Sequence, residues 1–307
     1  MTALTRHSGS TLSGRATSWG NELPAEVISR LSRQDLSALA RRLEQRPSGA
    51  GPVVRTIHHF ACTGGTLISR GLQSQPNTLL LSEVDPLSTI QLKTQRSRFA
   101  PTDPVLLARG ALNPIGDDTA VDMFLASLDV LSRALHKVGR NLVLRDHAHS
   151  QFCTEVDWKA RPSLGGMLRG VVPVHSVVTV RHPVDSFLAL DRNNWRHFSP
   201  FSLDEYSRRY AAFLDEYDGV PTIRYERFVS DPDETMREIC RHLDLPYNPD
   251  WKALISIMKL SGDSGRRGDR ISPRPRREYS AELSEEARAS LAYRELCDRM
   301  GYDASLD

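Results

Sequence analysis

Lysine is scarce in this chain of 307 residues, because only five of the 40 basic side chains are lysines and the other 35 are arginines. The nucleotide composition of the genome accounts for such a bias, while arginine also suits phosphate clamps through its fork of donors. The formal net charge is only +2. A field this weak does not favour nucleic acid or a membrane surface, so no nucleic-acid partner is expected.

Cysteines are also few, and long apolar runs are absent. The four cysteines are scattered without a Cys-x-x-Cys pair, which argues against a structural zinc site or a disulfide framework. We therefore expect a reducing, cytoplasmic compartment. No stretch approaches the about 18 apolar residues that a membrane span needs. Residues 1–15 are polar and lack the apolar core of a signal peptide, so neither feature is expected.

The first 50 residues differ in composition from the rest. Residues 1–21 are rich in serine, threonine and glycine, which predicts a flexible tail. Apolar residues between Leu23 and Gln45 then recur at helical spacing, which predicts one amphipathic helix. Packing on the domain is the preferred place for it, and contact with a partner is the alternative. The proline- and glycine-rich run at residues 47–52 breaks the chain. We expect residues 51–307 to form the main domain.

Apolar strands alternate with helical segments through this main domain. Strands are expected at residues 53–58, 78–82, 141–145, 176–181 and 221–225. Helices are expected from Thr66, at 119–138, after Pro183, and at 203–217, 231–243 and 282–300. This alternation is typical of an α/β fold with three layers, in which helices cover both faces of a central parallel sheet.

Residues 53–69 read as a strand, a glycine turn and the start of a helix. Such a turn points backbone N–H groups at one spot beside the positive end of the helix dipole. Gly64 and Gly65 let the backbone approach an anion closely, and Thr63 and Thr66 add hydroxyl groups. The same residues fit an ordinary turn in which Thr66 caps its own helix. The pattern G-x-x-x-x-G-K-[ST] is absent, so an anion site here suits a sulfuryl donor better than magnesium-bound ATP.

From residue 59 to residue 66 the chain resembles the sulfotransferases that use 3′-phosphoadenosine 5′-phosphosulfate (PAPS). Some branches of that family read His-Ile-Pro-Lys-Thr-Gly-Gly-Thr, and this chain reads His-Phe-Ala-Cys-Thr-Gly-Gly-Thr. The resemblance implies that residues 62–66 hold the 5′-phosphosulfate. Cys62 stands where the family usually carries its catalytic cation. Arg70, one turn into the helix, and His59 are the alternative cations in the sequence.

Residues 176–186 resemble the family's segment for the 3′-phosphate, a strand that ends in Arg-x-Pro. Arg181 at this strand end can clamp a phosphate with two bonds. The family has a serine eight residues after that arginine, and here the position is Ala189. Ser186 lies three residues earlier on the same helical face, so we expect it to take over the contact.

Residues 222–232 resemble a third family segment, a strand that ends in Arg-Tyr-Glu. The resemblance implies that Tyr225 lies near the adenine, while a half-buried packing residue is the alternative. Residues 264–270 occupy the place of the family's loop over the 3′-phosphate, although a solvated basic loop through residues 266–277 explains the charges equally well. The resemblance in this loop implies that three more residues bind the donor: Arg266, Arg267 and Gly268.

The resemblance covers residues 53–280 and implies a P-loop-like anion site within a sulfotransferase-like catalytic domain at residues 51–307. It implies transfer of a sulfuryl group from PAPS to a hydroxyl or amine of a small-molecule or glycan acceptor. Such a transfer proceeds by in-line attack without a metal and depends on positioning and electrostatics. A homo-oligomer is compatible with the sequence.

Three side chains are candidates for the base that takes the acceptor proton. Glu83 follows the second strand, and His147 and His149 follow the third. These strands should end at the edge where ligands bind in open α/β sheets. A histidine titrates near working pH, whereas a glutamate base needs a raised pKa. Glu83 and His147 together are the preferred assignment.

Two further functions remain open from the sequence. Cys62 and Ala189 are compatible with a nucleotide-binding relative of the same fold that turns over weakly or not at all. Asp146, after an apolar strand, would suit a small-molecule kinase as a ligand for magnesium.

Overall fold

The computed structural model describes residues 32, 37, 51–90, 102–258, 260 and 271–306. The predicted N-terminal tail lies outside these residues, as do Arg266, Arg267, Gly268 and all of the predicted amphipathic helix except Ser32 and Ser37.

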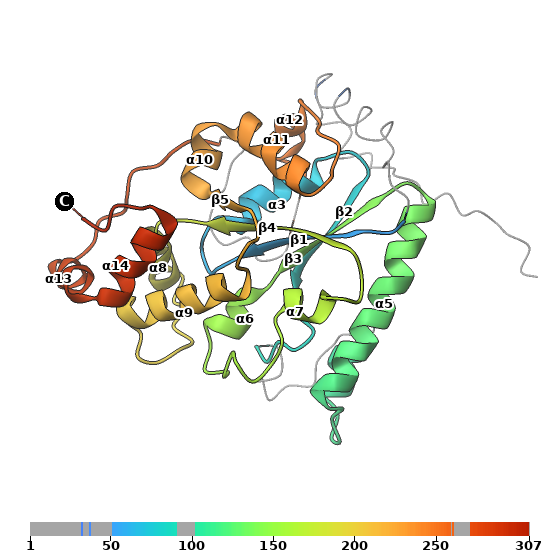
Figure 1. Ribbon diagram of the computed structural model, residues 1–307, viewed down its shortest axis with the longest axis horizontal. Helices are drawn as coiled ribbons and strands as arrows, with labels where there is room; N and C mark the ends of the chain where they lie inside the picture. The colour runs from blue at the N-terminus through green and yellow to red at the C-terminus, as the bar shows by residue number, and fades with distance from the viewer. Residues whose placement is uncertain are drawn as a thin grey trace, which may run out of the picture.

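A central sheet of five strands organises the molecule (Figure 1), and its strand order is β2-β3-β1-β4-β5. All neighbouring strands are parallel. The strands are β1 (Val54–His59), β2 (Thr78–Val84), β3 (Asn141–Asp146), β4 (Val174–Val180) and β5 (Thr222–Arg224). Every residue of β1 and β3 is buried, as expected for parallel strands covered on both faces. All five strands predicted from the sequence are confirmed.

Twelve helices of the described ranges surround this sheet. They are α3 (Gly65–Gln73), α4 (Pro104–Arg109), α5 (Asp117–Lys137), α6 (Ala148–Phe152), α7 (Leu164–Leu168), α8 (Pro183–Arg192), α9 (Leu203–Glu216), α10 (Tyr225–Ser230), α11 (Pro232–His242), α12 (Trp251–Leu254), α13 (Ala281–Ala289) and α14 (Leu291–Met300). Helices α3, α10, α11 and α12 lie on one face of the sheet in Figure 1, and α5, α6, α7 and α9 lie on the other. This is the predicted three-layer α/β fold.

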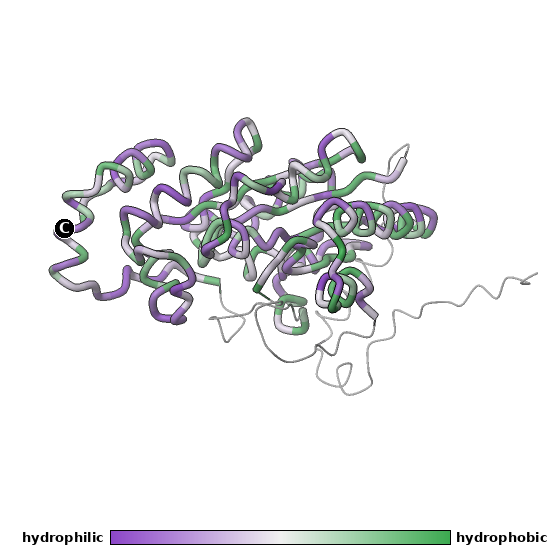
Figure 2. Tube along the Cα trace, turned by 90° about the horizontal axis from the view of Figure 1, so that it is seen from below, coloured by the Kyte–Doolittle hydropathy of each residue, from purple (hydrophilic) through white to green (hydrophobic). Residues whose placement is uncertain are grey.

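Apolar side chains fill the space on both sides of the sheet. Ile57 of β1 and Trp251 of α12 belong to the cluster beneath α3, while Phe60 and Phe213 belong to the cluster beneath α9. Phe60 stacks on Tyr210 with ring centroids 4.5 Å apart. Figure 2 shows hydrophilic and hydrophobic residues alternating along the helical turns, which is the pattern of helices with one face on a core. Within the described ranges, no helix is both long and apolar enough to cross a membrane.

Local sequence explains where several helices begin. Asp231 accepts a hydrogen bond from the backbone N–H of Glu234, and Pro232 occupies the first turn of α11. Ser202 caps α9 in the same way.

The prediction of a single helix at residues 282–300 is wrong, because the structure has two helices that meet at Ser290. The Ser290 hydroxyl accepts a hydrogen bond from the N–H of Tyr293 and lies 2.6 Å from Asp204. Ser290 therefore caps α14, and its contact with α9 holds the break. The apolar spacing continues through the break, so the periodicity alone does not show it.

Candidate active site

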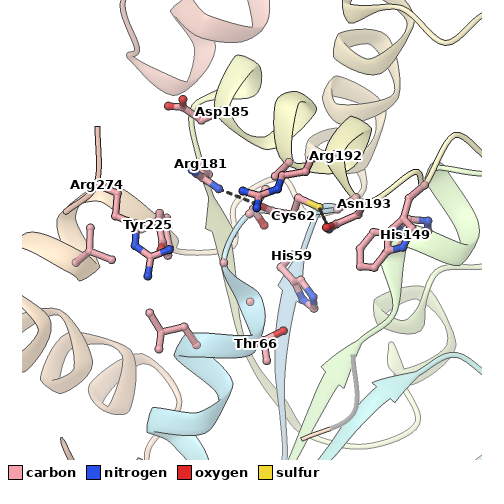
Figure 3. A pocket seen from close by; sticks show the side chains of 18 of the residues that line it. His59, Cys62, Thr66, His149, Arg181, Asp185, Arg192, Asn193, Tyr225 and Arg274 are labelled. Carbon is pink, nitrogen blue, oxygen red and sulfur yellow. Dashed lines mark hydrogen bonds between the residues drawn. The ribbon is translucent and has the colours of Figure 1, made fainter. Parts of the chain in front are cut away.

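A cavity of about 910 Å³ opens at the edge where all five strands end. Each strand contributes to its lining: the turn after β1, Glu83 of β2, Arg145 of β3, Arg181 after β4 and Tyr225 after β5. Parallel strands place their carboxyl ends on one edge, which is where ligands bind in open α/β sheets. In Figure 3, side chains from separate segments, among them Arg181, Arg192 and Tyr225, lie around the turn at Cys62.

The turn after β1 leaves the start of α3 uncapped by any side chain. Gly64 is the N-cap residue, and no side-chain hydrogen bond caps the helix. The Thr66 hydroxyl instead accepts a hydrogen bond from Arg145 at 2.9 Å, so the self-capping alternative does not hold. The Thr63 hydroxyl donates to the Phe60 carbonyl at 2.8 Å and closes the turn. The positive end of the helix dipole therefore faces the cavity without a side-chain partner.

Close neighbours leave no room for a side chain at either glycine of the turn. A Cβ at Gly64 would lie 2.2 Å from the Tyr225 ring, and Gly64 has a φ of +89°. A Cβ at Gly65 would lie 2.3 Å from the His59 ring. The backbone of the turn thus lies directly against two aromatic side chains, an approach that a larger residue would prevent.

Arg145 links the turn to the other strand ends, although sequence reasoning did not assign it a role. Its guanidinium donates to Thr66 at 2.9 Å and to Ser82 at 2.9 Å. It also forms an ion pair with Glu83, with 2.6 Å between Arg145 Nη1 and Glu83 Oε1. Arg145 is only 4% exposed, so these bonds fix the cation in place. The sequence feature that could have pointed to Arg145 is the presence of a charged residue at the end of the apolar strand β3.

His59 does not supply a cation. Its Nε2 lies 3.2 Å from Arg145 Nη2, a contact in which the imidazole accepts the hydrogen bond. Burial, and then the positive charge of Arg145, lower the pKa of His59 well below its usual value. His59 is therefore neutral and acts as an acceptor for Arg145. Arg70, the other alternative from the sequence, lines the cavity.

Glu83 and His147 lie together, as the sequence predicted. Glu83 Oε2 is 3.2 Å from His147 Nε2, while its other oxygen pairs with Arg145. The carboxylate thus lies between a guanidinium and an imidazole and can stabilise positive charge on both. His149 lines the same cavity, but burial lowers its pKa to about 3, so its imidazole is neutral near physiological pH.

Cations gather at the opposite end of the cavity. Arg181 Nη1 lies 3.4 Å from the Cys62 carbonyl oxygen, and its guanidinium stacks over Tyr225 at 5.1 Å. Burial, and then the charges of Arg181 and Arg192, lower the pKa of the Arg277 guanidinium. Arg277 therefore lies close enough to Arg181 and Arg192 for their charges to repel its own. An anion bound between them would relieve that repulsion.

The acidic side chains at this end already have partners. Asp185 forms an ion pair with Arg276 at 3.3 Å. Glu226 accepts hydrogen bonds from the N–H of His182 at 3.0 Å and from the Tyr302 hydroxyl at 2.6 Å. Among the described residues, no carboxylate lies within ion-pair distance of Arg181, Arg192 or Arg277. Their charge is therefore available to a bound anion.

Cys62 carries no charge in the turn. Burial raises the pKa of its thiol to about 11, and the Asn193 amide donates to its sulfur at 3.7 Å. The thiol is therefore protonated at neutral pH and neither acts as a cation nor presents a thiolate. Its backbone, in contrast, shapes the turn, with a φ of +62°.

Two residues singled out from the sequence do not reach the cavity. Ser186 is fully buried, and its hydroxyl donates to the carbonyls of His182 and Pro183 in its own helix, so it does not replace the missing serine. Asp146 is also buried, and it is bonded to His58 at 2.8 Å and Tyr217 at 2.7 Å. A magnesium ligand at Asp146 does not fit this placement.

Sequence reasoning missed several residues that line the cavity. Arg192 is the last residue of α8 and Asn193 follows it, so their roles depend on how that helix ends beside the turn. Arg274 and Arg277 belong to the basic run that was open to a solvated-loop interpretation, and the structure places both at the cavity. Trp195 also lines the cavity.

Comparison with known proteins agrees with this arrangement. No curated protein matches the chain significantly. Among solved structures, it is similar to the sulfotransferase domain of the olefin synthase from Synechococcus PCC 7002, with 16% identity, a TM-score of 0.49, and coverage of 84% of this chain and 98% of that one. It is also similar to mouse sulfotransferase SULT7A1 complexed with PAP, with 10% identity, a TM-score of 0.38, and coverage of 88% and 95%. A family model, described as the sulfotransferase family, matches residues 60–249, and the chain belongs to that family.

Proposed function

We propose that this protein transfers a sulfuryl group from PAPS to a hydroxyl or amine of a small acceptor. The observation that carries the proposal is the position of Arg145, which touches Thr66 of the anion-binding turn and Glu83 of the Glu83–His147 pair. A fixed cation, a helix start and a base therefore meet at one point. These are the groups that an in-line transfer between negatively charged oxygens requires.

The donor fits the cavity with its charged groups at two places. The backbone N–H groups at the start of α3 suit the 5′-phosphosulfate. Arg181, Arg192 and Arg277 suit the 3′-phosphate, because each offers a fork of donors and none forms an ion pair with a described carboxylate. Tyr225 lies flat against Gly64 and beneath Arg181, so its ring forms a wall beside the turn.

Arg145 takes the role that the family gives to a cation in the turn itself. Cys62 occupies that position here and is uncharged. In the proposed reaction, the acceptor oxygen or nitrogen attacks sulfur as the bond from sulfur to the phosphate oxygen breaks. Negative charge then grows on the departing 3′-phosphoadenosine 5′-phosphate (PAP), where Arg145 and the helix start stabilise it. A single preorganised donor of this kind contributes about 10²–10³-fold in rate.

His147 accepts the acceptor proton in this proposal, and Glu83 holds the imidazole. The Glu83 carboxylate contacts His147 at Nε2, which leaves Nδ1 as the nitrogen that takes the proton. The same carboxylate then lies beside the imidazolium and stabilises it, as a carboxylate does in other histidine–carboxylate pairs. His149 remains neutral and forms part of the cavity wall.

Two measurements test the function. Isothermal titration should detect PAP binding, and label from ³⁵S-PAPS should appear on at least one member of a panel of phenols, monosaccharides and amines. PAP binding without transfer across the panel would favour the nucleotide-binding relative instead. Magnesium-dependent binding of ATP together with no binding of PAP would contradict the proposal.

A further inference from the structure

Glu83 contacts Arg145 and His147 from a point where β2 is irregular. The pairing register of β2 with β3 shifts between Leu81 and Val84, and Glu83 adopts a φ of +60°. A bulge of this kind redirects a side chain that regular pleating would point elsewhere. Glutamate rarely adopts this left-handed conformation, so the surrounding structure must hold it.

A buried ion pair immediately follows this bulge. Asp85 accepts two hydrogen bonds from Arg161, from Nη1 at 2.9 Å and from Nη2 at 2.8 Å. Both side chains are only 7% exposed, and the planar fork fixes their relative orientation. Asp85 Oδ1 also accepts a hydrogen bond from the N–H of Leu87 at 3.0 Å, which holds the backbone in place just after the bulge.

The same carboxylate connects to the segment that carries His147. The Ser150 hydroxyl donates to Asp85 and lies 2.7 Å from the His147 carbonyl oxygen. The His147 N–H donates to the Val84 carbonyl at 3.2 Å. The Arg161 carbonyl is in turn bonded to Gln151 of α6 at 3.3 Å. Asp85 therefore joins the end of β2, the turn after β3 and the loop before α7.

We propose that Asp85 and Arg161 are positioning residues that hold Glu83 against Arg145 and His147. Neither side chain lines the cavity, so neither touches the donor or the acceptor. The pair acts by fixing the backbone on both sides of the Glu83–His147 contact. The catalytic consequence rests on the proposed function, while the positioning itself is a property of the fold.

Asp85→Asn tests this role, because the change keeps the shape of the side chain and removes its charge. We expect the kcat of transfer to fall at least about tenfold, since small displacements of a catalytic group have large effects on rate. The Kd for PAP should change less than about twofold, because the turn and Arg181 are untouched. Arg161→Lys keeps the charge but loses the fork, so we expect a smaller fall in kcat.

Asp129→Asn is the matched control, because it removes a carboxylate from an exposed ion pair with Arg133 on α5. Thermal melting and PAP titration establish the folded fraction of each variant. Equal kcat per folded molecule in Asp85→Asn and Asp129→Asn would overturn the positioning role. A lower melting temperature in Asp85→Asn with unchanged kcat would overturn it as well.

A second readout does not depend on turnover. The imidazole resonances of His147, recorded by NMR in the PAP complex, should shift in Asp85→Asn and not in Asp129→Asn. Unchanged His147 resonances would reject the positioning role even if transfer is observed. A wild-type protein that transfers no label would reject the proposed function, so the two failures can be told apart.

Discussion

Arg145 Nη2 lies 2.9 Å from the hydroxyl oxygen of Thr66, so a guanidinium from the third strand lies beside the turn after β1. Position 62 of that turn carries a neutral thiol. Under the proposed function, Arg145 at the end of β3 supplies the charge that the family usually carries in this turn.

The first prediction concerns this cation. We expect Arg145→Gln to lower kcat by about 10²–10³-fold, because the change removes a preorganised charge from the transferring group. Binding of PAP should weaken much less, since Arg181 and the helix start remain. Initial rates with ³⁵S-PAPS and PAP titration measure the two effects. Arg133→Gln, in an exposed pair on α5, is the control, and an equal loss of kcat in both variants would contradict the role of Arg145.

The second prediction concerns the opposite end of the cavity. Arg181→Ala should weaken PAP binding by about 1.5–3 kcal/mol, the range for a hydrogen bond to a charged group, or roughly 10–150-fold in Kd. Isothermal titration gives the value directly. Arg299→Ala removes an equal charge from an ion pair with Asp215, and its affinity for PAP should be that of the wild type. Unchanged affinity in Arg181→Ala would remove Arg181 from the donor site.

The third prediction concerns the close approach at Gly64. Gly64→Ala should abolish measurable PAP binding, because the new methyl group would meet the Tyr225 ring at 2.2 Å and displace the turn. Gly170→Ala separates this clash from backbone strain. Gly170 also has a positive φ, +75°, but nothing lies within 4 Å of its Cβ position. Both variants should lose stability by about 1–2 kcal/mol, and only Gly64→Ala should lose PAP, as melting and titration will show.

The fourth prediction concerns stability at low pH. Burial lowers the pKa of His149 from 6.5 to about 3, so the unfolded chain binds a proton below pH 6.5 that the folded chain does not. Stability should therefore fall as the pH drops from 6.5 towards 3, by up to about 2 kcal/mol at pH 5 from this residue. His149→Gln should reduce this fall, as measured by urea unfolding at pH 7 and pH 5.

His175→Gln provides the control for that measurement, because His175 is exposed on β4. Equal pH dependence in His149→Gln and the wild type would show that His149 is not the residue responsible.

The sequence predicted the sheet well, because its strands are short segments bounded by turn residues and separated by helical segments, and β1 and β3 are buried throughout. The sequence also predicted that Glu83 and His147 lie at one edge of the sheet, because parallel strands place their carboxyl ends on the same side. Arg145 was missed because its role depends on where the side chains of Thr66 and Glu83 lie in space. Ser186 was misplaced because helical spacing does not show whether a hydroxyl bonds to its own backbone.

The break at Ser290 and the bulge at Glu83 escaped prediction for a related reason. Ser290 caps α14 while it contacts Asp204, which is 86 residues away in the chain. The bulge at Glu83 is visible only in the register of β2 against β3. Periodicity reports local preference, and both features are fixed by distant partners.

The uncapped start of α3 has a consequence for how the donor site is mapped. The groups that we propose to bind the donor anion there belong to the main chain, and replacement of a side chain by alanine leaves each N–H in place. An alanine scan would therefore assign too little of the binding energy to this turn. Semisynthetic replacement of single amide bonds by esters would remove the N–H donors one at a time. It would show how much of the binding free energy comes from the backbone and how much from the arginines.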